Sequence, residues 1–131
     1  MYGWFKVIKM NDTLIIIAGV IGVSVAIVHG VLLQKLMIKP LLQSTYGKEM
    51  PASSQKLIPL LLHFSTIFWF VGGILLIASP FIFNQEQRLI ISLGVCSFYI
   101  VGALGNLWGT KGKHPGWVLL AISVLLIVFG L

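Results

Sequence analysis

The chain divides into four long apolar runs separated by short polar segments. A helix needs about 20 apolar residues to cross a hydrocarbon core roughly 30 Å thick, so charge-free runs bounded by charge, Pro or Gly are candidate spans. Such runs cover residues 13–33, 57–79 and 89–108, and a shorter one covers residues 115–131. The short run can still cross where the bilayer thins locally. The pattern predicts an all-α fold, a transmembrane four-helix bundle, with residues 1–131 as a single integral membrane domain.

Composition supports a membrane location. Hydrophobic residues make up 58% of the chain and charged residues only 9%, and the mean hydropathy is +1.03. Soluble proteins have roughly 45–50% apolar and about 25% charged residues. The net charge of +6 rests on too few residues to make a nucleic-acid surface. Cys96 is the single cysteine, which excludes an intramolecular disulfide.

The basic residues predict the topology. Segments 34–56 and 109–116 lie on one side of the four predicted spans and carry six lysines, whereas the other side carries Lys6, Lys9 and Arg88. The positive-inside rule then places both termini outside. The N-terminal stretch YGWFKVIKM fits a short interfacial segment or a frayed tail, and Met10 is an alternative start.

Small residues mark helix-packing faces. In the first span they recur at every fourth position, as Ala18, Gly22, Ala26 and Gly30. Such a stripe lets a neighbouring backbone approach closely, so this face is predicted to be an interface with a helix of the same chain or of a second subunit. The second span has the Gly72-Gly73 pair, and the third has Gly94, Gly102, Ala103 and Gly105.

The segment after the first span is the largest extramembrane piece. Its first part, KLMIKPLL, is predicted to extend the first helix until Pro40 interrupts it. This extension is expected to lie on the inner surface with Lys35 and Lys39 toward anionic headgroups.

Polar side chains are predicted to form one layer in the inner half of the membrane. His29 lies six residues before Lys35 and His63 seven after Lys56, which gives matching depths of about 9 and 10 Å. Thr66 shares a helix face with His63. Asn106 falls at nearly the same level, and His114 lies at the rim. Buried ionisable groups in membranes are costly and usually face the bundle interior, so the layer is a candidate ligand site.

Several interpretations of this layer stay open. The polar groups can act as hydrogen-bonding glue between helices. They can also bind a quinone or another lipophile, or His29 and His63 can ligate a haem iron. The three acidic residues, Asp12, Glu49 and Glu86, all lie in tails or loops, which argues against a catalytic metal and against carboxylate-driven proton coupling. No nucleotide loop or nucleophile motif occurs, so we expect a protein that is not an enzyme.

Three blocks of the chain resemble a family of small bacterial four-helix integral membrane proteins with no assigned activity. The blocks are VHGVLLQKLMIKPLL, LLHFSTIFWF and KGKHPGWVLL. The family pattern maps onto this sequence at His29, Ile38, Pro40, Leu41, His63, His114, Pro115 and Trp117. Leu62 stands where the family has Trp before the second histidine. The resemblance implies the four-helix fold, a bacterial inner (plasma) membrane, and Trp117 as a further site residue.

The leading functional hypothesis is a non-catalytic membrane protein. Its histidine layer is expected to bind a lipophilic small molecule or a partner helix, in a homo-oligomer or as an accessory subunit of a larger membrane complex. The alternatives are a small homo-oligomeric transporter or channel, and a redox subunit that binds haem or quinone. The candidate ligand-binding residues are His29, His63, Thr66, Asn106, His114 and Trp117.

Overall fold

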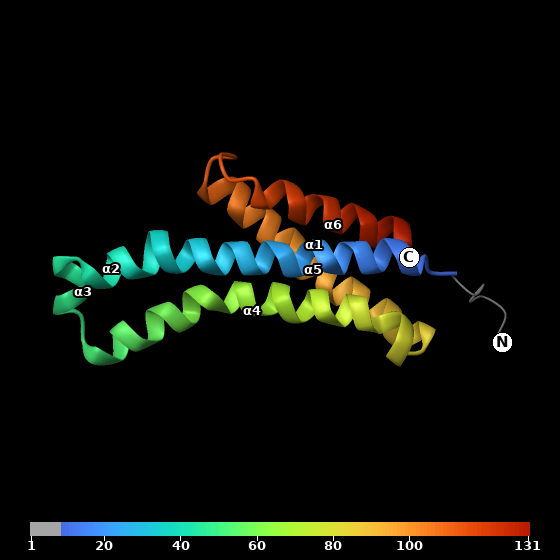
Figure 1. The fold of residues 1–131 in the computed structure, drawn as a ribbon, viewed down its shortest axis with the longest axis horizontal. Helices are drawn as coiled ribbons and strands as arrows, with labels where there is room; N and C mark the ends of the chain where they lie inside the picture. Colours follow the sequence, from blue (N-terminus) through green and yellow to red (C-terminus); the bar gives the residue numbers. More distant parts are fainter. Residues whose placement is uncertain (1–8) are drawn as a thin grey trace.

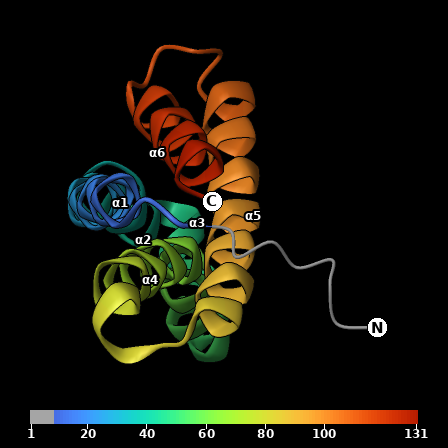
Figure 2. The ribbon, with the colours of Figure 1, turned by 90° about the vertical axis from the view of Figure 1, so that its right-hand side faces the viewer.

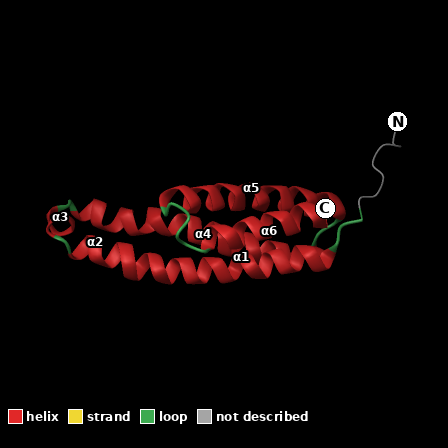
Figure 3. Cartoon of the chain, turned by 90° about the horizontal axis from the view of Figure 1, so that it is seen from above, coloured by secondary structure: helices red, strands yellow, loops and turns green. Residues whose placement is uncertain are grey.

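The computed structural model describes residues 9–131, and all regular structure within them is helical (Figure 3). The body consists of α1 (Asp12–Leu33), α4 (Ala52–Ile82), α5 (Gln85–Gly109) and α6 (Gly116–Gly130). Three helical segments are long and apolar enough to cross a membrane, and α6 is a shorter apolar helix. The all-helical fold predicted from the sequence is confirmed. The interfacial segment predicted for residues 2–10 lies almost wholly outside the described residues, as does Lys6.

The four helices pack around one core. α1 contacts α4 and α6, and α5 contacts the same two helices from the other side. Figure 1 shows α1 and α4 running side by side over most of their lengths. In Figure 2, α1 is seen nearly end-on while α5 runs across the view, so α5 is strongly inclined to α1. This inclination brings α5 close to α4 over only part of its length.

The end of the bundle where α1 begins and α6 ends is closed by polar contacts. Asn84 begins α5 with a capping box, in which its side chain and that of Gln87 each accept a backbone N–H of the other. The next residue, Arg88, forms an ion pair with Asp12 at the start of α1. The Asn11 backbone N–H donates to the Gly130 carbonyl at 2.8 Å, which joins α1 to the end of α6.

The first helix continues past Pro40, so the prediction that Pro40 ends it is wrong. A π-helical turn, η1 (Gln34–Ile38), leads directly into α2 (Lys39–Gln43). In this turn the Lys39 N–H donates to the Gln34 carbonyl, five residues back, so the hydrogen-bond ladder has shifted before Pro40 is reached. Pro40 then occupies the first turn of α2, where a missing N–H is tolerated.

The extension projects from the bundle. Figure 1 shows α2 continuing the direction of α1, followed by the short α3 (Thr45–Glu49), which returns the chain to α4. The expectation that this extension lies on the inner surface stays a prediction. We call residues 34–56 the arm.

The remaining helix boundaries differ modestly from those predicted. α4 extends beyond residues 57–79 at both ends and contains Pro59 and Pro80 in its interior. α5 begins earlier than residue 89 because the capping box fixes its start. α6 covers 116–130, with Pro115 at its N-cap.

The small-residue stripe of α1 lies at helix contacts within the chain, which confirms it as an interface. Ala18 and Ala26 are fully buried. A Cβ on Gly22 would lie 1.7 Å from the Tyr99 hydroxyl oxygen of α5, and one on Gly30 would lie 3.0 Å from Thr66 Cγ2 of α4. The Tyr99 hydroxyl also donates to the Trp69 carbonyl of α4 at 3.2 Å. One tyrosine thus links α5 to both α1 and α4.

Glycines set the closest approach of α1 and α4. A Cβ on Gly19 would lie 2.6 Å from the Gly73 carbonyl oxygen, and a Cβ on Gly73 would lie 2.7 Å from the Gly19 carbonyl oxygen. Neither position can accept a side chain without separation of the two backbones. In α5, by contrast, Gly94 and Gly105 have open space around them. The predicted glycine face of the third span is therefore an interface only in part.

Candidate functional site

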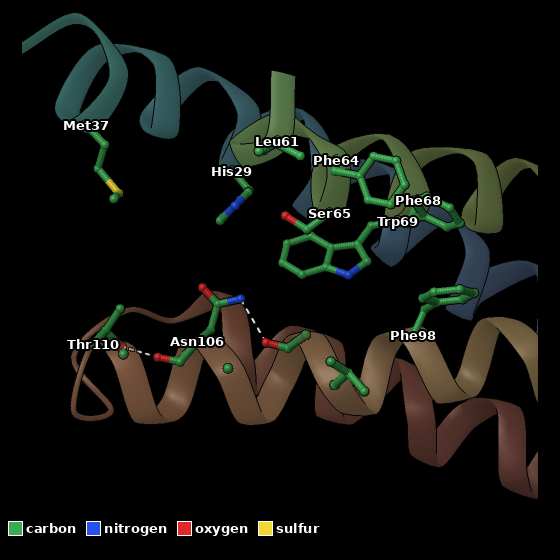
Figure 4. A pocket seen from close by; sticks show the side chains of 14 residues that line it. His29, Met37, Leu61, Phe64, Ser65, Phe68, Trp69, Phe98, Asn106 and Thr110 are labelled. Carbon is green, nitrogen blue, oxygen red and sulfur yellow. Dashed lines mark hydrogen bonds between the residues drawn. The ribbon is translucent and has the colours of Figure 1, made fainter. Parts of the chain in front are cut away.

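A groove of about 600 Å³ lies between α4 and α5, with His29 and Met37 of the first helical segment on its wall. It lies in the half of the bundle that carries the arm and the loop between α5 and α6 (Figures 1 and 4). Its lining is mostly apolar and aromatic. The lining residues are His29, Met37, Leu61, Phe64, Ser65, Phe68, Trp69, Phe98, Val101, Gly102, Gly105, Asn106, Gly109 and Thr110. We call this space the α4/α5 groove.

The inclination of α5 and its glycines create the groove. At Gly102 the two helices touch, because a Cβ there would lie 2.5 Å from Cζ2 of the Trp69 indole. Beyond this contact, Gly105 and Gly109 present no side chains toward α4, and a Cβ on either would meet nothing within 4 Å. Past Gly102, α5 diverges from α4. No side chain at Gly105 or Gly109 fills the space between the two helices.

The aromatic end of the groove is closed by phenylalanine rings in tilted contact. Phe64 and Phe68 of α4 have ring centroids 4.6 Å apart, and Phe68 and Phe98 of α5 have centroids 4.8 Å apart. The Phe68–Phe98 pair bridges α4 and α5. It forms an apolar floor on the side of the groove nearer the middle of α5.

Three polar side chains face the opposite end. In Figure 4, His29 and Ser65 point into the space from one wall, and the Asn106 amide points into it from the other. The Asn106 Nδ2 group donates to the Gly102 carbonyl at 2.9 Å, which orients the amide oxygen toward the groove. Thr110 donates its hydroxyl to the Asn106 carbonyl at 2.6 Å and completes this end of the wall.

His29 is held by Trp69. The two rings meet edge to face, with centroids 4.8 Å apart and an interplanar angle of 60°. Trp69 is only 4% exposed, so packing on both sides fixes its position. Its ring therefore sets the orientation of the imidazole, whose nitrogens face the groove in Figure 4.

His63 does not share the groove. Its Nε2 lies 3.1 Å from Oε1 of Gln34, at the start of the π-helical turn. Because His63 is level with Gln34 and His29 is level with Trp69, the two histidines are offset along α1 by five residues, or about 7.5 Å. The prediction of matching depth is wrong. That prediction assumed that Lys35 and Lys56 lie at one level along the bundle. Helix α4 begins in the arm at Ala52, so Lys56 lies farther out than Lys35.

The structure places the other predicted site residues in three different settings. Asn106 lines the groove. Thr66 lies at the α1–α4 contact near Gly30, with its Oγ1 buried and unpartnered among the described residues. His114 accepts the Gly116 N–H at its Nδ1 (3.0 Å), and Trp117 donates its indole N–H to the Gly112 carbonyl (3.2 Å). These last two hold the loop before α6.

Sequence reasoning missed several groove residues. Ser65, Phe68, Phe98 and Thr110 carry no motif, and their shared location depends on how α5 crosses α4. Trp69 packs against Gly102 and His29, and the same ring lines the groove.

The chemistry of the lining residues is that of binding. His29 is the sole ionisable side chain among them, and hydroxyl and amide groups supply the other polar atoms. Within residues 9–131, no three His, Cys, Asp or Glu side chains come together as a metal site. The groove holds one imidazole, whereas haem ligation from opposite faces needs two. No family model, curated protein or solved structure matches this chain.

Proposed function

We propose that the protein is a four-span integral membrane protein with both termini outside. Long apolar helices and exposed apolar side chains on α1, α4, α5 and α6 support the spans, and the six lysines of segments 34–56 and 109–116 support the orientation. α6 has 15 residues, which span about 22 Å and so call for local thinning of a bilayer core roughly 30 Å thick. A bacterial inner membrane and membership of the small four-helix family remain predictions from the sequence.

We propose further that the protein binds a lipophilic small molecule in the α4/α5 groove. The observation that carries this proposal is the order of polarity along the groove. His29, Asn106 and Thr110 lie at the end near the α5–α6 loop, whereas Phe68 and Phe98 lie toward the middle of the helices. In a membrane this order matches an amphiphile, whose polar head stays near the surface while its apolar part points to the bilayer centre.

The size and opening of the groove fit such a ligand. Its volume of about 600 Å³ falls within the roughly 300–1,000 Å³ of small-molecule sites. Leu61, Phe64 and Val101 on its rim are 67%, 56% and 70% exposed, so the side of the groove faces the lipid. A lipophile can enter laterally from the bilayer without crossing water.

A pair of glycine substitutions in α5 tests the proposal. Both Gly105 and Gly94 are exposed helical glycines whose Cβ would meet nothing within 4 Å, but only Gly105 lines the groove. Gly105→Phe is expected to fill the groove, and Gly94→Phe is its matched control. The measurement is mass spectrometry of lipophiles that co-purify with each variant and with the wild type.

The expected result is a species retained by the wild type and by Gly94→Phe but depleted in Gly105→Phe. Circular dichroism of each variant confirms that the helical content is unchanged. Identical lipophile profiles for the two variants would refute binding in the groove and leave the polar residues as hydrogen-bonding glue between helices.

A further inference from the structure

The end of the protein that holds the polar part of the groove is strongly basic. The arm and the α5–α6 loop carry Lys35, Lys39, Lys48, Lys56, Lys111 and Lys113, with Glu49 as their single acidic residue. Asp12 and Glu86 lie at the starts of α1 and α5, at the opposite end. Any group placed at the polar end of the groove therefore experiences a positive electrostatic potential.

Two of these lysines lie close in sequence to the polar end of the groove. Lys111 follows Thr110, a lining residue, Lys113 comes two positions later, and both are exposed. Lys111 has φ 51°, a left-handed conformation that is uncommon for a residue with a side chain. The backbone holds this turn rigidly in place, because the Gly112 N–H donates to the Leu107 carbonyl at 2.9 Å and the Lys113 N–H to the Thr110 carbonyl at 3.1 Å.

Side chains on both sides of the turn hold it as well. The Trp117 indole donates to the Gly112 carbonyl, and the Thr110 hydroxyl oxygen accepts the His114 backbone N–H at 3.3 Å. The backbone that carries both lysines is therefore fixed relative to Asn106 and Thr110. This arrangement fits a cationic mouth above an apolar groove.

We infer that the ligand is a lipid with an anionic phosphate head. The inference rests on the proposed function of the groove. The phosphate lies at the mouth beside Lys111 and Lys113, and His29 and Ser65 donate hydrogen bonds to its polar linkage. The apolar chain lies against Trp69, Phe68 and Phe98 and leaves through the open side into the bilayer. A free phosphate would leave this aromatic surface unoccupied.

The test is a lipid titration of the purified, delipidated full-length protein in detergent, followed by native mass spectrometry. The probes are phosphatidylglycerol and phosphatidylcholine with the same acyl chains, and inorganic phosphate as competitor. The variants are Lys111→Gln/Lys113→Gln and, as a control with the same change in net charge, Lys48→Gln/Lys56→Gln in the arm. Gly105→Phe and Gly94→Phe accompany them.

The wild type is expected to prefer phosphatidylglycerol over phosphatidylcholine by about tenfold or more, the effect of two lysines near an anionic head. Lys111→Gln/Lys113→Gln should abolish this preference, and Lys48→Gln/Lys56→Gln should keep most of it. Inorganic phosphate at millimolar concentration should not displace the lipid.

Each other outcome has a distinct meaning. If the wild type binds the two lipids equally and Gly105→Phe loses this binding, the ligand is not specifically anionic. The groove then remains a site for a lipophile. Binding that Gly105→Phe does not change more than Gly94→Phe overturns both proposals. Displacement of the lipid by inorganic phosphate would assign the site to a free anion and overturn the proposal of a lipid ligand.

Discussion

Gly22→Ala tests the contact between α1 and α5 most directly. A Cβ at this position would lie 1.7 Å from the Tyr99 hydroxyl oxygen and 2.5 Å from Cζ of the same ring. Tyr99 is fully buried, so its ring can move only by displacing neighbours. Overpacking of this kind costs about 1–3 kcal/mol. Displacement of the ring also breaks the hydrogen bond to the Trp69 carbonyl, worth about 0.6 kcal/mol in a membrane bundle.

Two terms set the expected net change. Replacing a helical glycine by alanine stabilises the helix by about 0.5–1 kcal/mol, so Gly22→Ala should destabilise the protein by about 1–3 kcal/mol. Gly94→Ala is the control, because its Cβ meets nothing and only the favourable propensity of about 0.5–1 kcal/mol remains. The two variants should differ by about 2–4 kcal/mol in free energy of unfolding.

The assay is reversible unfolding by sodium dodecyl sulfate in mixed micelles, followed by far-ultraviolet circular dichroism. Tyr99→Phe in the Gly22→Ala background removes the atom nearest to the new methyl group and should recover part of the loss. A Gly22→Ala variant as stable as Gly94→Ala would refute the reasoning, because α5 would then not lie against the small-residue face of α1.

Two further predictions concern polar contacts between helices. His63→Ala and Gln34→Ala should show a coupling of about 0.6 kcal/mol in a double-mutant cycle of the same unfolding assay, because each removes one partner of an interhelical hydrogen bond; additive effects would show that the bond contributes nothing. Asp12→Asn should cost about 1–2 kcal/mol, between the values for exposed and buried pairs, because the Arg88 side chain is only 13% exposed. This cost should shrink in high salt, and an equal cost at all salt concentrations would contradict an ion-pair origin.

Local patterns predicted the helices and one packing face. Runs of apolar residues identified four helical segments, because hydrophobic length is a property of the chain alone. The stripe from Ala18 to Gly30 identified a contact face, because residues four apart share one side of a helix. The contribution of Gly19 was missed, since it lies one position beside the stripe and becomes essential only where Gly73 meets it.

The register between helices could not be read from the sequence. His29 and His63 have similar distances to the nearest lysine, yet the arm carries Lys56 beyond the level of Lys35 and sets the histidines about 7.5 Å apart. His114 was predicted as a ligand residue from its level at the rim of the polar layer, and Trp117 from the family resemblance. Their side chains make hydrogen bonds within the loop instead, which local sequence does not reveal.

The groove exists because glycines stand where larger side chains of α5 would fill the space beside α4. Gly102, Gly105 and Gly109 follow one another along the face of α5 that turns toward α4. The Trp69 ring packs against Gly102 and fixes the distance between the helices. Gly105 and Gly109 leave the space beyond this contact open. A helix built only to pack would place leucine or phenylalanine at these two positions, because unfilled contact area forfeits dispersion energy. A ligand bound as proposed would supply the missing contacts and offset this cost. Filling Gly105 with phenylalanine should therefore raise stability in detergent while removing the ligand, a combination that a purely structural role for this glycine does not produce.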